Sequence, residues 1–153
     1  MSNEFIEEYN VFLAGEISAV ETYELALKSV VQEDIKQALT KCQSCHAKRV
    51  DKLTACVVDL GGKPDTSSGV WGPFAELCQK GASSETEAIA LLEQSEAERL
   101  VQYEAQQKIL VAPVLDVLTN DLLPAQHETH LMMSSLLKSM PTPGDTKLVS
   151  VKA

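Results

Sequence analysis

Two glutamates and two histidines occupy positions that should otherwise be apolar, and side chains of these types can together bind a metal ion. A short motif occurs twice, from Gly15 to Glu24 and from Ser95 to Glu104: a small residue, a Glu, six residues and a Tyr-Glu pair. A histidine follows about thirty residues after each motif glutamate, at His46 and His130. Carboxylates and imidazoles are common protein ligands of zinc and iron.

The elements that must position these side chains are four amphipathic helices. Apolar residues recur at steps of three and four, which predicts helices at about residues 4–31, 34–60, 84–109 and 113–139. Gly61 and Gly62 should end the second helix. Ser83 or Ser84 should begin the third helix, and Pro124 should kink or restart the fourth.

The connection between the second and third predicted helices is too long for a simple hairpin turn. It covers residues 61–84 and is rich in Gly, Pro and Ser, which favours a crossover along the length of a bundle. A short helix is expected within it, at residues 71–80. The sequence therefore predicts an all-α fold, with one four-helix bundle over residues 1–140 and a loose tail over residues 141–153.

Helix geometry brings the motif glutamates and the two histidines to about the same level of this bundle. Each Glu lies about as far before its interhelical turn as the next His lies after it, so the two face each other across an antiparallel pair. An isolated carboxylate in the core is costly, so each must be protonated, paired with a histidine or Arg49, or bound to a cation. The motif tyrosines, Tyr23 and Tyr103, either hydrogen-bond into this layer or serve as ordinary core aromatics.

The composition disfavours several classes of partner. Thirteen basic and twenty-two acidic residues give a net charge of −9, which argues against binding to nucleic acid or to anionic membranes. No run approaches the roughly 20 apolar residues of a transmembrane helix, and the first residues lack the features of a signal peptide. We therefore expect a cytoplasmic protein with reduced cysteines.

One match to a cofactor motif lies in the second predicted helix. The Cys-x-x-Cys-His run from Cys42 to His46 has the spacing of a covalent haem site, but it falls inside a helix and no sixth ligand is specified. We therefore expect no haem. Cys42 and His46 share a helix face, which leaves a zinc or copper site open. In the alternative interpretation, Cys42, Cys45 and Cys56 are small buried apolar residues.

Taken together, these residues resemble the ferritin-like superfamily. Within it, the chain is similar to bacterial four-helix-bundle domains of unknown function that are related to rubrerythrin and to stress-induced bundle proteins. The resemblance covers residues 12–137. It is carried by six segments: Gly15-Glu16 to Tyr23, His46-x-x-Arg49, Leu60-Gly61-Gly62, Ser68-Gly69-x-Trp71, Leu92 to Tyr103 with Glu96, and Leu122-Leu123-Pro124-x-Gln126 to His130.

The resemblance implies a central metal site. Diiron centres of this family take a Glu from each of helices one and three, and a Glu-x-x-His pair from each of helices two and four. Four residues match that ligand set: Glu16, His46, Glu96 and His130. Gln43 and His127 stand where the other two glutamates would be, so an oxygen-activating diiron oxidase is not expected. Further candidate ligands are His127, Gln43 and Cys42, with Tyr23, Tyr103 and Arg49 in supporting positions.

Two functions from different classes follow from this pattern. One is a small ferritin-like protein whose central Glu/His site binds iron, zinc or a similar divalent ion, in a stress-related or metal-handling role implied by the resemblance. The other is a metal-free structural or interaction bundle in which Glu–His and Glu–Arg49 hydrogen bonds fill the site. A redox enzyme with oxidase- or peroxidase-like activity is a third alternative, and no catalytic residue is assigned. The resemblance also implies self-association, as a dimer or a larger assembly.

Overall fold

The described part of the chain is built from helices. The computed structural model describes residues 2–67 and 84–140. Its elements are, in chain order, α1 (Ser2–Leu27), α2 (Glu33–Asp59), α4 (Glu85–Gln107), α5 (Val114–Val117), the π-helical turn η1 (Leu118–Leu122) and α6 (Leu123–Lys138). No strand occurs in these residues, so the predicted all-α class is confirmed for them.

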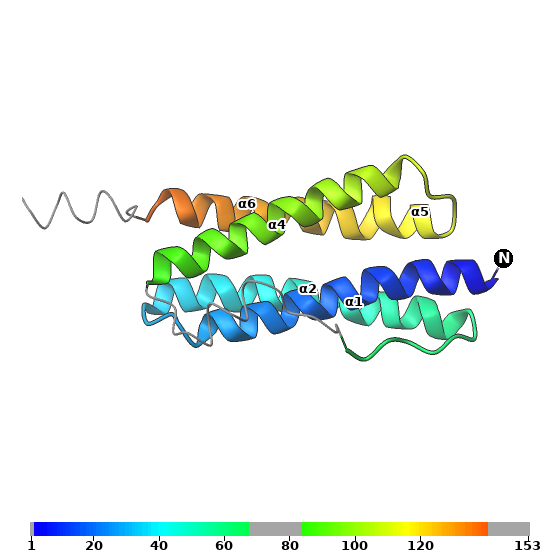
Figure 1. The fold of residues 1–153 in the computed structure, drawn as a ribbon, viewed down its shortest axis with the longest axis horizontal. Coiled ribbons are helices and arrows are strands. Elements are labelled where there is room, and N and C mark those ends of the chain that lie inside the picture. Colours follow the sequence, from blue (N-terminus) through cyan, green and yellow to red (C-terminus); the bar gives the residue numbers. More distant parts are fainter. Residues whose placement is uncertain (1, 68–83, 141–153) are drawn as a thin grey trace, which may run out of the picture.

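The helices form two antiparallel hairpins that lie side by side (Figure 1). In one hairpin α1 packs along α2, and in the other α4 packs along α6. The turn η1 joins α5 to α6, so these three elements make one continuous helical rod. The C-terminal end of α2 and the N-terminal end of α4 lie at opposite ends of the bundle, and α1 and α4 consequently run antiparallel.

Local sequence explains where α2 ends and where α4 begins. After α2, the N–H groups of Gly61 and Gly62 donate to carbonyls of the last helical turn, both at 2.9 Å. Gly61 has a φ of 78°, a left-handed conformation that glycine adopts without strain. At the start of α4, the Ser84 hydroxyl accepts the N–H of Glu87 at 3.1 Å. Both boundaries are those predicted from these residues.

One carboxylate attaches the turn of the first hairpin to the start of the second. Glu85, the first residue of α4, accepts the N–H groups of Val31 at 2.6 Å and Gln32 at 3.0 Å. The Gln32 side chain adds a third hydrogen bond at 2.9 Å. The backbone hydrogen bonds hold the pKa of Glu85 below its ordinary value.

The fourth helical rod widens into a π-helical turn just before Pro124. The turn η1 covers Leu118–Leu122, and α6 follows directly with Pro124 in its first turn. Proline lacks an N–H and its ring clashes with the carbonyl four residues earlier, so a wider turn accommodates it. The expected kink or restart at Pro124 takes the form of this π turn. It also sets which residues of α6 face the core.

The apolar core is divided into two clusters. The first consists of Tyr9, Phe12, Leu13, Leu53, Val57, Tyr103, Val114, Leu118, Leu122 and Leu123. The second consists of Tyr23, Ala26, Val30, Ile35, Leu39, Cys42, Ile89, Leu92 and Met133. Between them along α1 lies Glu16, which is fully buried. A polar level thus separates the two clusters near the middle of the bundle.

Several expectations differ from the structure or concern residues that it does not describe. The first helix ends at Leu27 instead of near residue 31, because the chain turns there toward α2. The short helix expected at residues 71–80, the tail at residues 141–153 and Cys78 all lie outside the described residues. In the described residues, no helix is both long enough and apolar enough to cross a membrane.

Candidate functional site

Eight buried polar side chains meet at the centre of the bundle, and we call them the polar layer. They come from both hairpins, and each is at most 4% exposed to solvent. The polar layer consists of Glu16 and Tyr23 on α1, His46 and Arg49 on α2, Glu96 and Tyr103 on α4, and Gln126 and Thr129 on α6.

His46 bridges the two hairpins. Its Nδ1 lies 2.5 Å from Oε1 of Glu16, and its Nε2 lies 2.7 Å from Oε2 of Glu96. An ionised carboxylate accepts hydrogen bonds and cannot donate them, so both ring nitrogens carry a proton. His46 is therefore an imidazolium held between two carboxylates, one from each hairpin.

Arg49 lies one turn further along α2 and supplies a second positive charge. Its Nη1 donates to Oε2 of Glu16 at 3.3 Å and to Oε1 of Gln126 at 2.5 Å. Its Nη2 donates to the Thr129 hydroxyl at 2.9 Å and to the carbonyl of Ala125 at 3.1 Å. One side chain of the first hairpin thus binds three residues of α6.

The two motif tyrosines reach across to each other's glutamates. Tyr23 of α1 donates to Oε2 of Glu96 at 2.6 Å, and Tyr103 of α4 donates to Oε2 of Glu16. Each tyrosine therefore binds the carboxylate of the other motif copy. The exchange follows from the antiparallel packing of α1 and α4, because the same seven-residue spacing, about 10.5 Å of helix, separates Glu from Tyr in both.

Glu96 also receives hydrogen bonds from α6. Its Oε1 accepts Nε2 of Gln126 at 2.8 Å and the hydroxyl of Thr129 at 2.6 Å. Gln126 Nε2 donates in addition to the backbone carbonyl of Glu96 at 2.9 Å. All four oxygens of the two buried carboxylates thereby accept at least one hydrogen bond from the protein.

Contacts within the polar layer outweigh the effect of burial on its charged groups. Burial alone would raise the pKa of Glu16 and Glu96, but the charge and hydrogen bonds of His46 hold both pKa values below the ordinary one. Burial would lower the pKa of His46, but the two carboxylates raise it above its ordinary value of 6.5. Burial and then the facing carboxylate raise the pKa of Tyr23 and Tyr103, so both stay protonated as donors.

The charges of the polar layer balance. Two ionised carboxylates are matched by one imidazolium and one guanidinium. A metal ion binds histidine through an unprotonated ring nitrogen, and His46 offers none in this arrangement. Within residues 2–67 and 84–140, no group of three or more His, Cys, Asp and Glu side chains could hold a metal ion. In this arrangement the donors of the polar layer do not fit a divalent metal centre.

Three of the four ligands expected from the resemblance lie in contact. Glu16, His46 and Glu96 meet in the polar layer, whereas His130 lies outside it. His130 is 28% exposed, and its Nε2 lies 2.9 Å from Oε2 of Glu93. Of these four expected ligands, only the one on α6 lies outside the polar layer.

The additional candidate ligands are not part of the polar layer. His127 is exposed on α6. Gln43 is half-buried and donates to the carbonyl of Val20 at 3.1 Å and to Glu24 at 3.0 Å. Cys42 is fully buried in the second apolar cluster.

The inward-facing pairs at a spacing of three differ from those that the resemblance implies. They are His46 and Arg49 on α2, and Gln126 and Thr129 on α6. The implied pairs are Gln43 and His46 on α2, and His127 and His130 on α6. Neither inward-facing pair contains a glutamate, so both helices contribute hydrogen-bond donors to the carboxylates of α1 and α4.

Sequence reasoning missed Thr129 and gave Gln126 no role in the site. The expected stripe on the fourth helix continued to His130, one residue beyond Thr129 and about 100° away around the helix. The wide turn η1 changes the phase of α6 relative to the residues before it. Pro124 and the spacing of three between Gln126 and Thr129 are the signals that could have located the pair.

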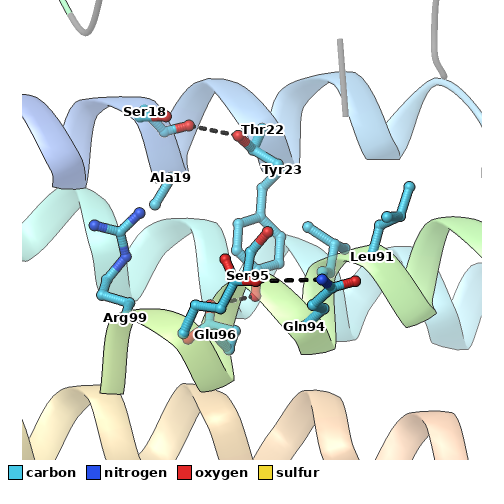
Figure 2. Close-up of a pocket in the computed structure, with 11 residues that line it drawn as sticks. Ser18, Ala19, Thr22, Tyr23, Leu91, Gln94, Ser95, Glu96 and Arg99 are labelled. Carbon is cyan, nitrogen blue, oxygen red and sulfur yellow. Dashed lines mark hydrogen bonds between the residues drawn. The ribbon is translucent and has the colours of Figure 1, made fainter. Parts of the chain in front are cut away.

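A cleft between α1 and α4 reaches the edge of the polar layer. Its volume is about 190 Å³, and Tyr23, Glu96 and Arg99 are among its lining residues. Figure 2 shows Tyr23 pointing from α1 toward Glu96 on α4, with Arg99 at one side. A Cβ at Gly15 would lie 2.7 Å from Nη1 of Arg99, so the small first residue of the motif leaves room for the guanidinium. The cleft has the size to admit water or a small polar molecule.

Comparison of the chain with protein-family models, with curated proteins and with solved structures finds no match. These comparisons neither support nor contradict the resemblance to the ferritin-like superfamily. The function is inferred from the geometry of the polar layer.

Proposed function

We propose that this protein is a structural or interaction bundle whose polar layer determines how its two helical hairpins pair. The observation that carries the proposal is the bridging position of His46, whose two ring nitrogens each contact a carboxylate of a different helix, at 2.5 Å and 2.7 Å. The imidazolium and the guanidinium of Arg49 together match the two negative charges of Glu16 and Glu96, and no bound cation is needed for this balance. These contacts require no catalytic role.

The physical advantage of such a layer is a single register. Apolar faces alone pack in more than one way, because the hydrophobic effect is not directional. A shift of one helical turn would leave a buried charge without its partner, which costs about 3–5 kcal/mol when a buried ion pair is broken. Tyr23 and Tyr103 each donate to a glutamate of the other hairpin, and a shifted register would break both hydrogen bonds. The polar layer therefore favours one pairing of the hairpins over its alternatives.

Exposed apolar side chains support a role in association. More than half of the surface is exposed for each of Val11, Val31, Val58, Val101, Ile109, Val111 and Leu131. They lie on both hairpins, and the proposal includes self-association as a dimer or a larger assembly. Light scattering over a range of protein concentrations tests this part, and a monomer at every concentration would remove it.

Divalent metal binding is the second candidate function. The observation that favours it is the direct contact among Glu16, His46 and Glu96, three of the ligands expected from the resemblance. Binding there would require His46 to lose a proton, so the affinity would have to rise with pH. The proposed bundle needs no such change.

Elemental analysis separates the two candidates. Protein purified without chelator is analysed for iron, zinc and manganese, and again after anaerobic incubation with Fe(II) or Zn(II) and removal of free ions. We expect no stoichiometric divalent ion at either stage. A stoichiometric ion that is lost in Glu16→Ala and Glu96→Ala but kept in the half-buried control Glu93→Ala would establish the metal site and overturn the metal-free proposal.

A further inference from the structure

A group of sulfur atoms lies in a groove between α2 and α6, beside the polar layer. The groove has a volume of about 780 Å³, and Cys42, Cys45 and Met132 are among its lining residues. Sγ of Cys42 lies 3.3 Å from Sδ of Met132. We propose that these three sulfur atoms form a binding site for one Cu(I) ion. The proposal does not rest on the function assigned to the polar layer.

The spacing of the sulfur atoms suits a single ion. Cys42 and Cys45 are three residues apart on α2, so their Cβ atoms are about 5–6 Å apart on one face of the helix. A thiolate–metal bond is about 2.3 Å long, so two sulfur ligands of one ion can lie up to about 4.6 Å apart. Binding of one ion by both thiols therefore requires that they rotate about χ1 until they lie within that limit. Met132 supplies the third ligand from α6.

The chemistry of the ligands selects Cu(I) over the commoner divalent ions. Thiolate and thioether groups are soft ligands that favour Cu(I), whereas magnesium, calcium and manganese favour oxygen. Structural zinc sites need four strong ligands from Cys, His, Asp or Glu, and a thioether is not one of them. The carboxylates that line the groove, Glu33 and Glu128, belong to exposed residues. Two thiolates and one thioether therefore match Cu(I) best.

The charges around the groove complement the loaded site. One Cu(I) ion with two thiolates has a net charge of −1. Lys41 and Lys48 line the groove, and Nη2 of Arg49 donates to Sγ of Cys45 at 3.5 Å. These cations stabilise the negative complex, although the formal net charge of the whole chain, with histidines counted as neutral, is −9.

Loading releases protons and transfers no electron. The S–H bonds of Cys42 and Cys45 break, two Cu–S bonds form with the thiolates, and the protons leave to solvent. Burial, followed by the nearby charge of Glu96, raises the pKa of Cys42 to about 12, so this thiol is protonated at neutral pH. The apparent affinity for Cu(I) should therefore rise with pH.

The test is an anaerobic titration of the reduced full-length protein with Cu(I), in competition with the chromogenic chelator bicinchoninate. We expect one Cu(I) per chain, a thiolate-to-copper band in the near ultraviolet, and sulfur-only coordination by X-ray absorption. Cys45→Ser and Cys42→Ala should each abolish binding. Met132→Leu keeps the side-chain size and should weaken the affinity by at least about 10-fold, because even the loss of a group that only orients a ligand costs that much.

Matched controls come from the other cysteines, since Cys56→Ser and Cys78→Ser should each keep one Cu(I) per chain. Thermal melts accompany every variant, because Cys42 is fully buried and its replacement can unfold the protein. Cys45 and Met132 are half-buried, so their variants keep the test decisive. The proposal fails if the wild type takes no Cu(I) from the chelator, if Cys45→Ser keeps wild-type affinity, or if nitrogen or oxygen ligands appear in the X-ray absorption.

Discussion

A single imidazolium explains why two carboxylates can be buried at the centre of this bundle. Moving either carboxylate out of water without a partner would cost several kcal/mol of desolvation free energy. His46 has one N–H on each side of its ring and so can serve Glu16 and Glu96 at the same time. Lysine is a compact point charge and arginine a fork that suits one carboxylate, so neither reproduces this bridge. At the scale of the residue, the choice of histidine follows from its two opposed donors.

This bridge predicts a maximum in the stability of the fold against pH. The raised pKa of His46 contributes stability that is fully present below its ordinary value of 6.5 and is lost as pH rises through the raised value. The lowered pKa values of Glu16 and Glu96 contribute stability that is present above 4.5 and is lost as pH falls through the lowered values. Urea unfolding of the wild type should therefore be hardest between these limits.

Replacing the bridge provides the control for this pH profile. His46→Gln should lower the free energy of unfolding near pH 6 by about 3–5 kcal/mol, because it leaves buried charge uncompensated. It should also remove the fall in stability at alkaline pH. His130→Gln breaks the half-exposed contact with Glu93 and should cost at most about 1 kcal/mol. Equal losses in the two variants would contradict the bridging role of His46.

At the scale of the helix, the sequence predicts where a helix begins and ends. It does not predict which side chains face the core after an irregular turn. Ser84 and Gly61 mark the beginning of α4 and the end of α2, since a cap needs only its own residues. The π turn before Pro124 depends on packing against the other helices, and it places Thr129 in the polar layer instead of His130. The partners of Tyr23 also depend on how α1 packs on α4. The two motif glutamates and His46 could be placed because they lie on uninterrupted helices.

Two glycine-to-alanine changes should have opposite effects on stability. Gly61→Ala forces a left-handed conformation on alanine and should lower the free energy of unfolding by about 1–2 kcal/mol, although nothing lies within 4 Å of the new Cβ. Gly15→Ala lies inside α1, where alanine is favoured over glycine by about 0.5–1 kcal/mol. Its Cβ meets the flexible end of Arg99, which can move aside.

Chemical denaturation with urea measures both changes. The two substitutions add the same atoms, so the opposite signs expected for them reflect the different backbone conformations at Gly15 and Gly61. A stabilised Gly61→Ala would show that α2 does not end in the left-handed turn described here. A strongly destabilised Gly15→Ala would show that Arg99 is held firmly against α1.

At the scale of the whole molecule, the buried charges of the polar layer cancel, whereas acidic side chains outnumber basic ones elsewhere. The polar layer contains two positive and two negative groups, so among the described residues the excess of acidic side chains lies outside it. A surface with this excess of carboxylates repels itself and opposes the compact state. Surface repulsion is screened by salt, whereas the buried pairs are screened much less.

This distribution predicts how stability responds to salt. Raising sodium chloride from about 0.01 M to 0.15 M shortens the Debye length from about 30 Å to 8 Å and should raise the melting temperature of the wild type. The difference in melting temperature between the wild type and His46→Gln should stay nearly constant over this range. Differential scanning calorimetry measures both, with potassium chloride as a control for ion-specific effects. A melting temperature that falls with salt would mean that surface pairs such as Lys52–Asp121, at 3.8 Å, outweigh the general repulsion.

The reciprocal binding of Tyr23 to Glu96 and of Tyr103 to Glu16 makes each hairpin chemically incomplete by itself. A hairpin alone would bury one carboxylate without its phenol and one phenol without its acceptor. None of these contacts requires that both hairpins belong to the same molecule. Two chains that exchanged hairpins would keep every Tyr–Glu pair and the His46 bridge, and concentrated protein would favour this by mass action. The interface that a domain-swapped dimer would use is thus already present within one chain.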